Sequence, residues 1–263
     1  MNNLESYMLD LLKRLKDEFG VVAVKAEFEA EGTRVDELLR LLELANKVNL
    51  KIGLKIGGCE AIRDLIESKS FGCDYIIAPM IETKYALQKF VEAREKTYGD
   101  DKNTKFLFNL ETTTAFQNRQ SLFDAAVGKL DGCVFGRVDY TGSLYMSRDS
   151  INDDVVTEDV CEAAALSKSN NLEIVVGGGV SMDSLNALRT IRDTKLTRFE
   201  TRKIIFSSDA LDLPEIEKGL LTAVEFELSW LKNKRAFYEV IFTEDEKRIN
   251  MLEARWKELL KTV

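Results

Sequence analysis

The spacing of apolar residues predicts alternating strands and helices along most of the chain. An opening helix is indicated by five apolar residues that share one helical face: Leu4, Met8, Leu11, Leu12 and Leu15. Gly20 marks the end of this helix. Predicted strands follow at residues 21–31, 50–57, 74–81, 105–111, 132–138, 173–176 and 203–206. Helical spacing fills the intervals, at residues 33–48, 60–69, 84–97, 115–128, 156–169 and 182–194.

This unbroken alternation is typical of a parallel sheet with right-handed crossover helices. Because the series contains no linker and the chain only two prolines, we expect residues 1–213 to close into a TIM-type (β/α) barrel. An open, doubly wound sheet is the alternative α/β fold. Seven predicted strands are one short of the usual eight. Either the opening helix takes the place of a strand, or a short strand is hidden in the pattern.

Residues 214–263 are predicted to form a C-terminal helical extension of the barrel. Pro214 would begin a helix that runs to about residue 240, and Thr243 with Glu246 forms a capping box for a last helix. Both helices carry apolar stripes, made of Leu220, Leu221, Val224, Leu228 and Leu231 and of Ile249, Leu252, Trp256 and Leu259. We expect these stripes to produce a homo-oligomer, at least a dimer, in which the partner's last helix covers part of the barrel mouth. Packing on the chain's own barrel is the alternative.

Composition restricts the possible partners and the compartment. The 263 residues carry a formal net charge of −8, which argues against nucleic acid and anionic membranes as partners. No apolar run is long enough to span a membrane, and residues 1–15 carry charges that do not fit a signal peptide, so we expect a cytoplasmic protein. The four cysteines lie far apart and form no CxxC pair, which indicates reduced packing residues.

The chain contains no histidine, and this absence limits its chemistry. Histidine-dependent acid–base catalysis, Ser–His triads and His-ligated zinc are excluded. Any catalysis must therefore use Asp, Glu, Lys, Arg, Tyr, Ser, Cys or a bound metal ion.

Alternation along the strands places several polar side chains inside the barrel, near the carboxyl ends of the strands. The inward-facing residues are Glu27, Glu29, Lys55, Asn109 and Glu111, and Asp139 directly follows its strand. Barrels carry their active sites at this end. Converging carboxylates repel one another, and a divalent cation that prefers oxygen ligands, Mg²⁺ or Mn²⁺, would relieve the repulsion. Alternatively, these acids form structural ion pairs with Lys25, Lys55 and Arg137.

Three segments resemble motifs of one enzyme family. Residues 109–112 (Asn-Leu-Glu-Thr) resemble the family's x-Ile-Glu-Thr strand end, and residues 136–143 (Gly-Arg-Val-Asp-Tyr-Thr-Gly-Ser) resemble its Gly-x-x-Asp-Leu-x-x-Ser loop. Residues 77–82 (Ile-Ala-Pro-Met-Ile-Glu) resemble its Ile-x-Pro-x-Val-Glu strand. In this order the segments resemble the HpcH/HpaI aldolase and citrate lyase beta-subunit family, part of the pyruvate/phosphoenolpyruvate barrel superfamily.

The resemblance implies a metal-dependent carbon–carbon lyase or aldolase that acts on a 2-oxo acid such as pyruvate. Glu111 and Asp139 match the family's metal ligands. The metal would bind the carboxylate and keto oxygens of the substrate and stabilise the enolate that forms as the carbon–carbon bond breaks. Further substrate contacts would come from Asn109 and from the backbone amides of Gly136, Arg137 and Val138.

Two departures from the family pattern affect the catalytic groups. Lys55 stands where family members use an arginine to polarise the keto oxygen, and lysine supplies a point charge without a bidentate fork. The family's histidine base is also missing. Glu27 and Glu29 match acids that order metal-bound waters, and one of them, or a metal-bound hydroxide, would act as the base. Two alternatives stay open: a Schiff-base aldolase that uses Lys55, and a non-catalytic barrel that serves as a binding or assembly subunit.

A run of three glycines at residues 177–179 follows a predicted strand and precedes a helix. The backbone amides of Gly178 and Gly179 would cradle a phosphate there, with the hydroxyls of Ser207 and Ser208 as additional donors. The substrate would then be a 2-oxo acid that carries a sugar or phosphate group. A tight turn into the helix is the alternative.

Overall fold

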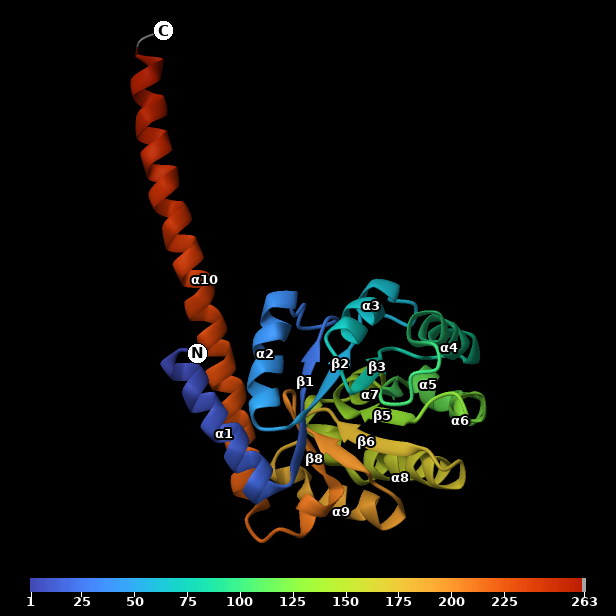
Figure 1. The fold of residues 1–263 in the computed structure, drawn as a ribbon. Coiled ribbons are helices and arrows are strands. Elements are labelled where there is room, and N and C mark those ends of the chain that lie inside the picture. Colours follow the sequence, from blue (N-terminus) through green and yellow to red (C-terminus); the bar gives the residue numbers. More distant parts are fainter. Residues whose placement is uncertain (262–263) are drawn as a thin grey trace.

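A computed structural model describes residues 1–261 and shows a closed barrel of eight strands in chain order (Figure 1). The strands are β1 (Val21–Glu27), β2 (Lys51–Lys55), β3 (Tyr75–Ala78), β4 (Lys105–Leu110), β5 (Gly132–Gly136), β6 (Glu173–Gly177), β7 (Arg198–Glu200) and β8 (Ile204–Ser207). Closure confirms the TIM-type barrel and excludes the open doubly wound sheet.

Helices surround the barrel and connect its strands. They are α1 (Asn3–Phe19), α2 (Val35–Lys47), α3 (Ile62–Ser70), α4 (Lys84–Tyr98), α5 (Thr113–Gln117), α6 (Arg119–Ala126), α7 (Arg137–Ser143), α8 (Asp154–Ser169), α9 (Leu185–Thr194) and α10 (Ile216–Leu260). Three short 3-10 helices complete the set: η1 (Arg148–Asn152), η2 (Met182–Ser184) and η3 (Ser208–Asp212). Within residues 1–261, no helix is both long and apolar enough to cross a membrane.

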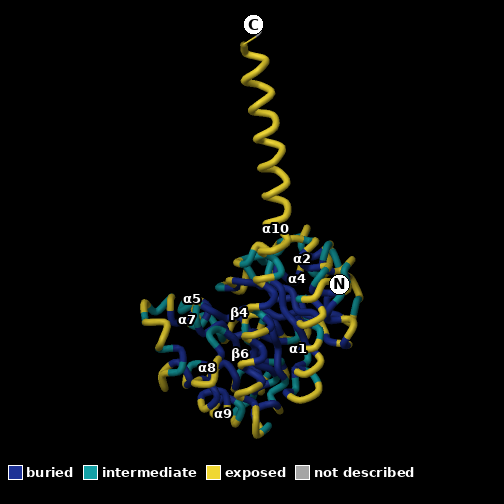
Figure 2. Tube along the Cα trace, turned by 90° about the vertical axis from the view of Figure 1, so that its left-hand side faces the viewer, coloured by how far each residue is buried: buried dark blue, intermediate teal, exposed yellow. Residues whose placement is uncertain are grey.

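Side chains that alternate along the strands form two apolar layers. On β4, Phe106 and Phe108 belong to the larger layer between strands and helices, whereas Leu107 belongs to a small cluster inside the barrel. Ala23, Tyr75, Val134, Val175 and Ile205 complete most of that inner cluster. Figure 2 shows the buried residues concentrated in the barrel. The interior is therefore filled with apolar side chains below the mouth, and the polar residues lie above this layer.

The strand missing from the sequence pattern is β7, which has only three residues. The expectation of a uniformly parallel sheet is wrong for the strand that follows it. Only residues 201–203 separate β7 from β8, too few for a crossover helix, so β8 runs antiparallel to both β7 and β1. The amide of Ile204 accordingly bonds to the hydroxyl of Thr201 across a tight turn, at 3.2 Å.

Reversal of β8 places its last residues at the amino-terminal end of the barrel. Ser207 pairs with Arg198 at the start of β7, and its amide donates to the carbonyl of Gly20, just before β1. The amide of Ser208 donates to the carbonyl of Thr197, at the same end. The expectation that Ser207 and Ser208 assist the glycine turn at residues 177–179 is therefore wrong, because that turn lies at the opposite end.

The C-terminal extension is one helix of 45 residues, α10, instead of the two predicted helices. At 1.5 Å per residue it is about 68 Å long. Thr243 does not cap a helix: its hydroxyl donates to the carbonyl of Glu239, one turn earlier in the same helix. The sequence Thr-x-x-Glu fits a helix interior as well as a helix start, and no Gly or Pro follows Gly219 to interrupt the helix. The first turns of α10 pack on α1, whereas its distal half projects away from the barrel (Figure 1).

Close packing between α10 and α1 depends on Gly219. A Cβ atom at this position would lie 2.8 Å from the side chain of Phe19. Crowding of this kind costs about 1–3 kcal/mol, against about 1 kcal/mol gained from better helix propensity. We therefore expect Gly219→Ala to lower the free energy of unfolding, measured by urea denaturation. Gly142→Ala is the matched control, since nothing lies within 4 Å of its Cβ position. An unchanged or higher midpoint for Gly219→Ala would contradict this packing.

Candidate active site at the barrel mouth

A cavity of about 530 Å³ opens at the carboxyl ends of β1 to β7. All but one of the site residues predicted from the sequence line it: Glu27, Glu29, Lys55, Asn109, Glu111, Gly136, Val138, Asp139, Gly178 and Gly179. The exception is Arg137. The parallel register explains the convergence, because neighbouring strands end at the same level, as Glu27 and Lys55 do.

Glu111, directly after β4, is the most deeply buried acid of the cavity, with 1% of its surface exposed. Its Oε1 accepts the backbone amide of Met80 at 3.0 Å, and its Oε2 accepts the Asn109 side-chain amide at 2.5 Å. Burial raises the pKa of Glu111 above its ordinary value, and the nearby charge of Asp139 raises it further. Lys55 and the two hydrogen bonds offset only part of this effect.

Two local features of the backbone hold Glu111 in this position. Gly136 ends β5 beside it, and a Cβ atom there would lie 2.9 Å from both Cβ and Oε2 of Glu111. Met80, after β3, has a positive φ of 50°, a conformation that is uncommon for residues other than glycine. This backbone conformation accompanies the hydrogen bond from the Met80 amide to the carboxylate. Local strain at such a position is typical of functional sites.

Asp139 lies in the first turn of α7 and is exposed to the cavity. A negative charge is favourable there, because unpaired backbone amides give the start of a helix a partial positive charge. Glu111 and Asp139 line the same cavity, and the charge of Asp139 raises the pKa of Glu111. The cavity therefore presents one buried and one exposed carboxylate from consecutive strand ends.

Each lysine of the mouth bridges two acids. Lys25 lies 3.2 Å from Glu27 and 2.5 Å from Glu200, and Lys55 lies 3.0 Å from Glu29 and 3.4 Å from Glu111. Burial alone would lower the pKa of either lysine, but the neighbouring carboxylates raise both values above the ordinary one. The ion-pair alternative thus describes Lys25 and Lys55. It also means that Lys55 stays protonated at neutral pH, whereas a Schiff base requires the neutral amine.

Comparison with known proteins identifies the family of this chain. A sequence model of the HpcH/HpaI aldolase/citrate lyase family matches residues 21–196, more than half of the chain. The chain belongs to this family. Its members are aldolases and lyases, so the family supports a carbon–carbon lyase type of function for this member. No curated protein matches the sequence.

Solved structures that share this fold include two that are named as members of the family. An HpcH/HpaI aldolase from Desulfitobacterium hafniense DCB-2 is 10% identical with a TM-score of 0.60, over 74% of this chain and 81% of the other. A family protein from Burkholderia cenocepacia J2315 is 14% identical with a TM-score of 0.56, over 82% and 99%. A variant of the citrate synthase SbnG is 14% identical with a TM-score of 0.55, over 82% and 97%. At these identities the likeness concerns the fold.

The side chain of Arg137 leaves the cavity of this family member. It is 1% exposed, and its guanidinium donates to the carbonyls of Gly177 and Gly178, at 3.3 and 3.1 Å, and to the Asn152 side chain at 2.8 Å. Burial lowers its pKa to about 10. The alternative in which Arg137 forms an ion pair with the acids of the mouth is therefore wrong. Its side chain instead joins the start of α7 to the glycine turn, and only its backbone amide is left for a substrate.

Backbone conformation and close packing account for two of the three glycines in the turn. Gly178 and Gly179 have φ values of 82° and 67°, which favour glycine. A Cβ atom on Gly178 would lie 2.6 Å from the amide nitrogen of Val138, and one on Gly179 would lie 2.4 Å from the side chain of Ile151. The tight-turn alternative thus explains these two glycines. Phosphate binding by Gly178 and Gly179 stays a prediction.

Glu200 is a buried cavity residue that the sequence pattern does not reveal. It ends β7, is 4% exposed, and has an Oε2 atom without a hydrogen-bond partner among residues 1–261. Gly177 makes room for it, since a Cβ atom there would lie 3.1 Å from the Glu200 side chain. Asn109 Oδ1 is likewise buried and has no partner. Two unpaired acceptors at one cavity indicate that it accommodates a ligand or ordered water.

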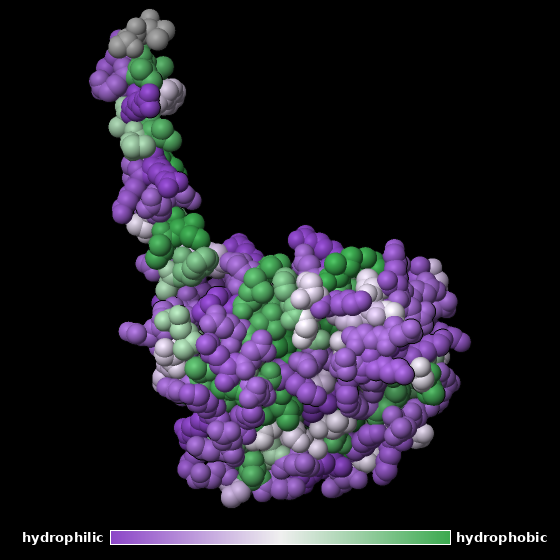
Figure 3. All heavy atoms as spheres, in the orientation of Figure 1, coloured by the Kyte–Doolittle hydropathy of each residue, from purple (hydrophilic) through white to green (hydrophobic). Residues whose placement is uncertain are grey.

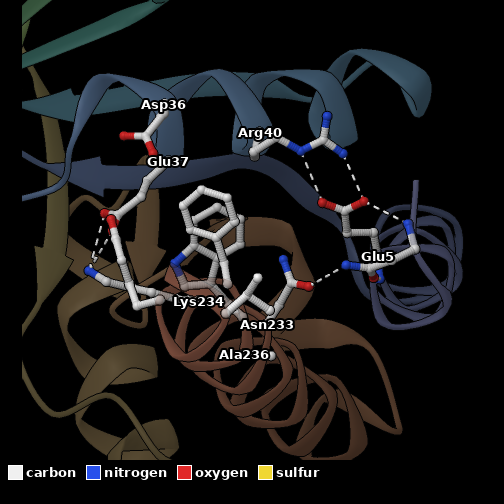
Figure 4. Close-up of a pocket in the computed structure, with 12 residues that line it drawn as sticks. Glu5, Asp36, Glu37, Arg40, Asn233, Lys234 and Ala236 are labelled. Atoms are coloured by element: carbon white, nitrogen blue, oxygen red, sulfur yellow. Dashed lines mark hydrogen bonds and ion pairs between the residues drawn. The ribbon is translucent and has the colours of Figure 1, made fainter. Parts of the chain in front are cut away.

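A second cavity, of about 480 Å³, lies between α1, α2 and α10 (Figure 4). Four of its five charged side chains are paired with one another: Glu5 with Arg40 at 2.8 Å, and Glu37 with Lys234 at 3.0 Å. Glu37 also accepts the hydroxyl of Tyr238 at 2.6 Å. These contacts fix α10 to α2, and we interpret this cavity as the junction that sets the direction of α10.

Removal of the Lys25 charge is expected to destabilise the barrel. Lys25→Met would leave Glu27 and Glu200 buried without their cation, which costs about 3–5 kcal/mol. Lys25 and Lys55 lower the pKa of Glu27, so this stabilisation is present above pH 4.5 and is lost as the pH falls through the pKa in the folded state. Urea denaturation should therefore show a large decrease in the free energy of unfolding of Lys25→Met at pH 7. The difference from the unchanged protein should become smaller in acid. The exposed Lys13→Met is the control, and an equal, small effect of both changes would contradict the burial argument.

Proposed function

We propose that this protein is a divalent-cation-dependent lyase or aldolase that cleaves or forms a carbon–carbon bond next to a 2-oxo acid. One observation carries the proposal. Glu111 and Asp139, the two residues that match the family's metal ligands, line the same cavity, and the charge of Asp139 raises the pKa of Glu111. Two carboxylates that repel each other in a partly buried site favour a bound cation.

The oxygen donors of the cavity fit a hard cation such as Mg²⁺ or Mn²⁺. Mg²⁺ is commonly held by one or two carboxylates, while water and substrate oxygens complete its coordination. Within residues 1–261 no group of three Asp, Glu, Cys or His side chains is arranged to hold a metal ion, so the cation would depend on these two carboxylates and on water or substrate oxygens. The unpaired Oδ1 of Asn109 adds a neutral oxygen beside Glu111. When bound, the cation would supply Lewis-acid stabilisation of the negative charge that develops on the keto oxygen.

The chain's own residues would position the substrate and move the proton. Lys55 stays protonated between Glu29 and Glu111 and would present its charge to the substrate oxygens. The backbone amides of Gly136 to Val138 would hold the substrate carboxylate. Glu27 is ionised at neutral pH, because Lys25 and Lys55 overcome the effect of burial on its pKa. An ionised Glu27, or Glu29 beside it, would accept the proton in the role that histidine has in other family members.

The cation site is tested by changing its two acids separately. We expect Glu111→Gln and Asp139→Asn each to abolish binding of Mg²⁺ and Mn²⁺ in calorimetric titrations, while circular dichroism shows a folded barrel. Asp154→Asn is the matched control, since Asp154 also lies exposed in the first turn of a helix but outside the cavity. Each protein would be titrated with the cation in the absence and in the presence of pyruvate or oxalate. Absence of any binding by the unchanged protein would refute the site assignment.

The Schiff-base alternative predicts a covalent intermediate, and the raised pKa of Lys55 argues against it. We expect pyruvate with borohydride to leave the mass of the protein unchanged, and turnover of 2-oxo acid and aldehyde pairs to be abolished by EDTA and restored by Mn²⁺. A borohydride-trapped adduct mapped to Lys55 by mass spectrometry would instead establish the Schiff-base mechanism.

A further inference from the structure

The distal part of α10 carries an apolar stripe. Apart from Tyr238, which contacts α2, its side chains are left largely uncovered by the other elements within residues 1–261. Its positions alternate in steps of three and four residues, and we call them the seam: Val224, Leu228, Leu231, Arg235, Tyr238, Phe242, Asp245, Ile249, Leu252 and Trp256. Seven of the apolar side chains are at least half exposed, from 50% for Leu228 to 67% for Phe242. Figure 3 shows hydrophobic side chains along the projecting helix. Exposure of this many apolar groups on one stripe is a strong association signal.

The spacing of the seam is that of a coiled coil. Steps of three and four average 3.5 residues, the repeat that keeps an apolar stripe facing a partner helix in a left-handed coiled coil. The face of α10 that packs on its own barrel is different and carries Gly219, Ala223, Phe226 and Trp230, which are buried. The helix therefore has one face for its own barrel and a second for another helix.

Two charged residues interrupt the seam, and they determine the orientation of the partner. Arg235 and Asp245 lie five residues on either side of Val240, and within residues 1–261 neither forms an ion pair. We propose that α10 pairs with α10 of a second copy as an antiparallel coiled coil centred on Val240. In this register Arg235 faces the partner's Asp245, twice by symmetry.

The same register aligns every other position of the seam. Residues whose numbers are symmetric about 240 face each other across an antiparallel pair. Val224 meets the partner's Trp256, Leu228 the partner's Leu252, Leu231 the partner's Ile249, and Tyr238 the partner's Phe242. Every apolar position thus faces an apolar one, and the only charges face their opposites. Such a self-complementary surface is what a twofold dimer requires.

A parallel pair would be unfavourable at the same two positions. It would place Arg235 against the partner's Arg235 and Asp245 against the partner's Asp245, and like charges that face each other in an interface cost several kcal/mol. Three of the charges that flank the seam already have partners within their own chain. Lys234 pairs with Glu37 at 3.0 Å, Glu227 with Arg202 at 3.9 Å, and Arg248 with Glu244 at 3.4 Å.

The antiparallel pair brings the second copy to the barrel mouth. Val224 and Glu227 belong to α10 and also line the cavity that contains Glu111. Because Val224 faces the partner's Trp256, the last turns of the partner helix lie at the rim of the cavity. Lys234 and Tyr238 hold α10 to α2, so the barrel fixes where the partner helix arrives. Each cavity is then completed by the end of the other chain.

Two single-cysteine variants test the register. Leu228→Cys and Leu252→Cys would be prepared separately, with Cys59→Ser and Cys161→Ser to remove the two cysteines that are not buried. We expect neither variant alone to form a disulfide-linked dimer, and their mixture to form one under mild oxidation. Cross-linking of each variant with itself would establish a parallel pair and overturn the proposal. So would a monomeric intact chain at micromolar concentration by light scattering.

Charge exchange at the two polar positions provides an independent test. Arg235→Asp and Asp245→Arg should each raise the dimer dissociation constant by about tenfold or more, since each creates like-charge contacts. The double variant should restore the original dissociation constant, because the opposite charges again face each other. Both positions are exposed on the helix, and circular dichroism would verify that the barrel is folded. A double variant as weak as either single one would overturn the antiparallel register.

Discussion

Charge neutralisation by two buried lysines is the interaction on which the barrel mouth depends. Lys25 and Lys55 bring together carboxylates from β1, from the ends of β4 and β7, and from the loop after β1, in a region mostly removed from water. Without these cations the acids would repel one another, and desolvation would favour their protonation. The lysines thus allow a cavity rich in carboxylates to exist above an apolar interior. The lysines also bind the carboxylate oxygens that face them. The oxygens left for a ligand are therefore Asn109 Oδ1, Glu200 Oε2 and the exposed carboxylate of Asp139.

The reversed strand β8 determines how the rest of the chain is arranged around this mouth. Because β8 runs toward the amino-terminal end of the barrel, α10 begins at that end and passes upward beside α1. A parallel last strand would have returned the following helix downward. In this fold the chain instead continues past the rim of the cavity, where Val224 and Glu227 contribute to its wall. One short turn at residues 201–203 therefore connects the topology of the sheet with the surroundings of the site.

Sequence patterns predicted the features that follow from strict periodicity, and missed those that depend on a few local residues. Alternation along the strands was sufficient to predict that Asn109 and Glu111 lie inside the barrel and that Asp139 follows a strand end. Glu200 was missed because a three-residue strand gives no measurable alternation. The direction of β8 follows from the short turn that precedes it, and the pattern of hydrophobic residues does not predict that direction. Thr243 was misread because a capping motif and a helix interior share the same residues.

The absence of histidine affects how the charges of the barrel mouth respond to pH. Histidine is the side chain whose ordinary pKa lies in the physiological range, and this chain has none. The lysines of the mouth have raised pKa values and Glu27 has a lowered one, so their charges stay constant from mildly acidic to alkaline conditions. Glu111 is the exception, since burial moves its pKa toward neutrality. Of these four groups, Glu111 is therefore the one whose charge a fall in pH changes first.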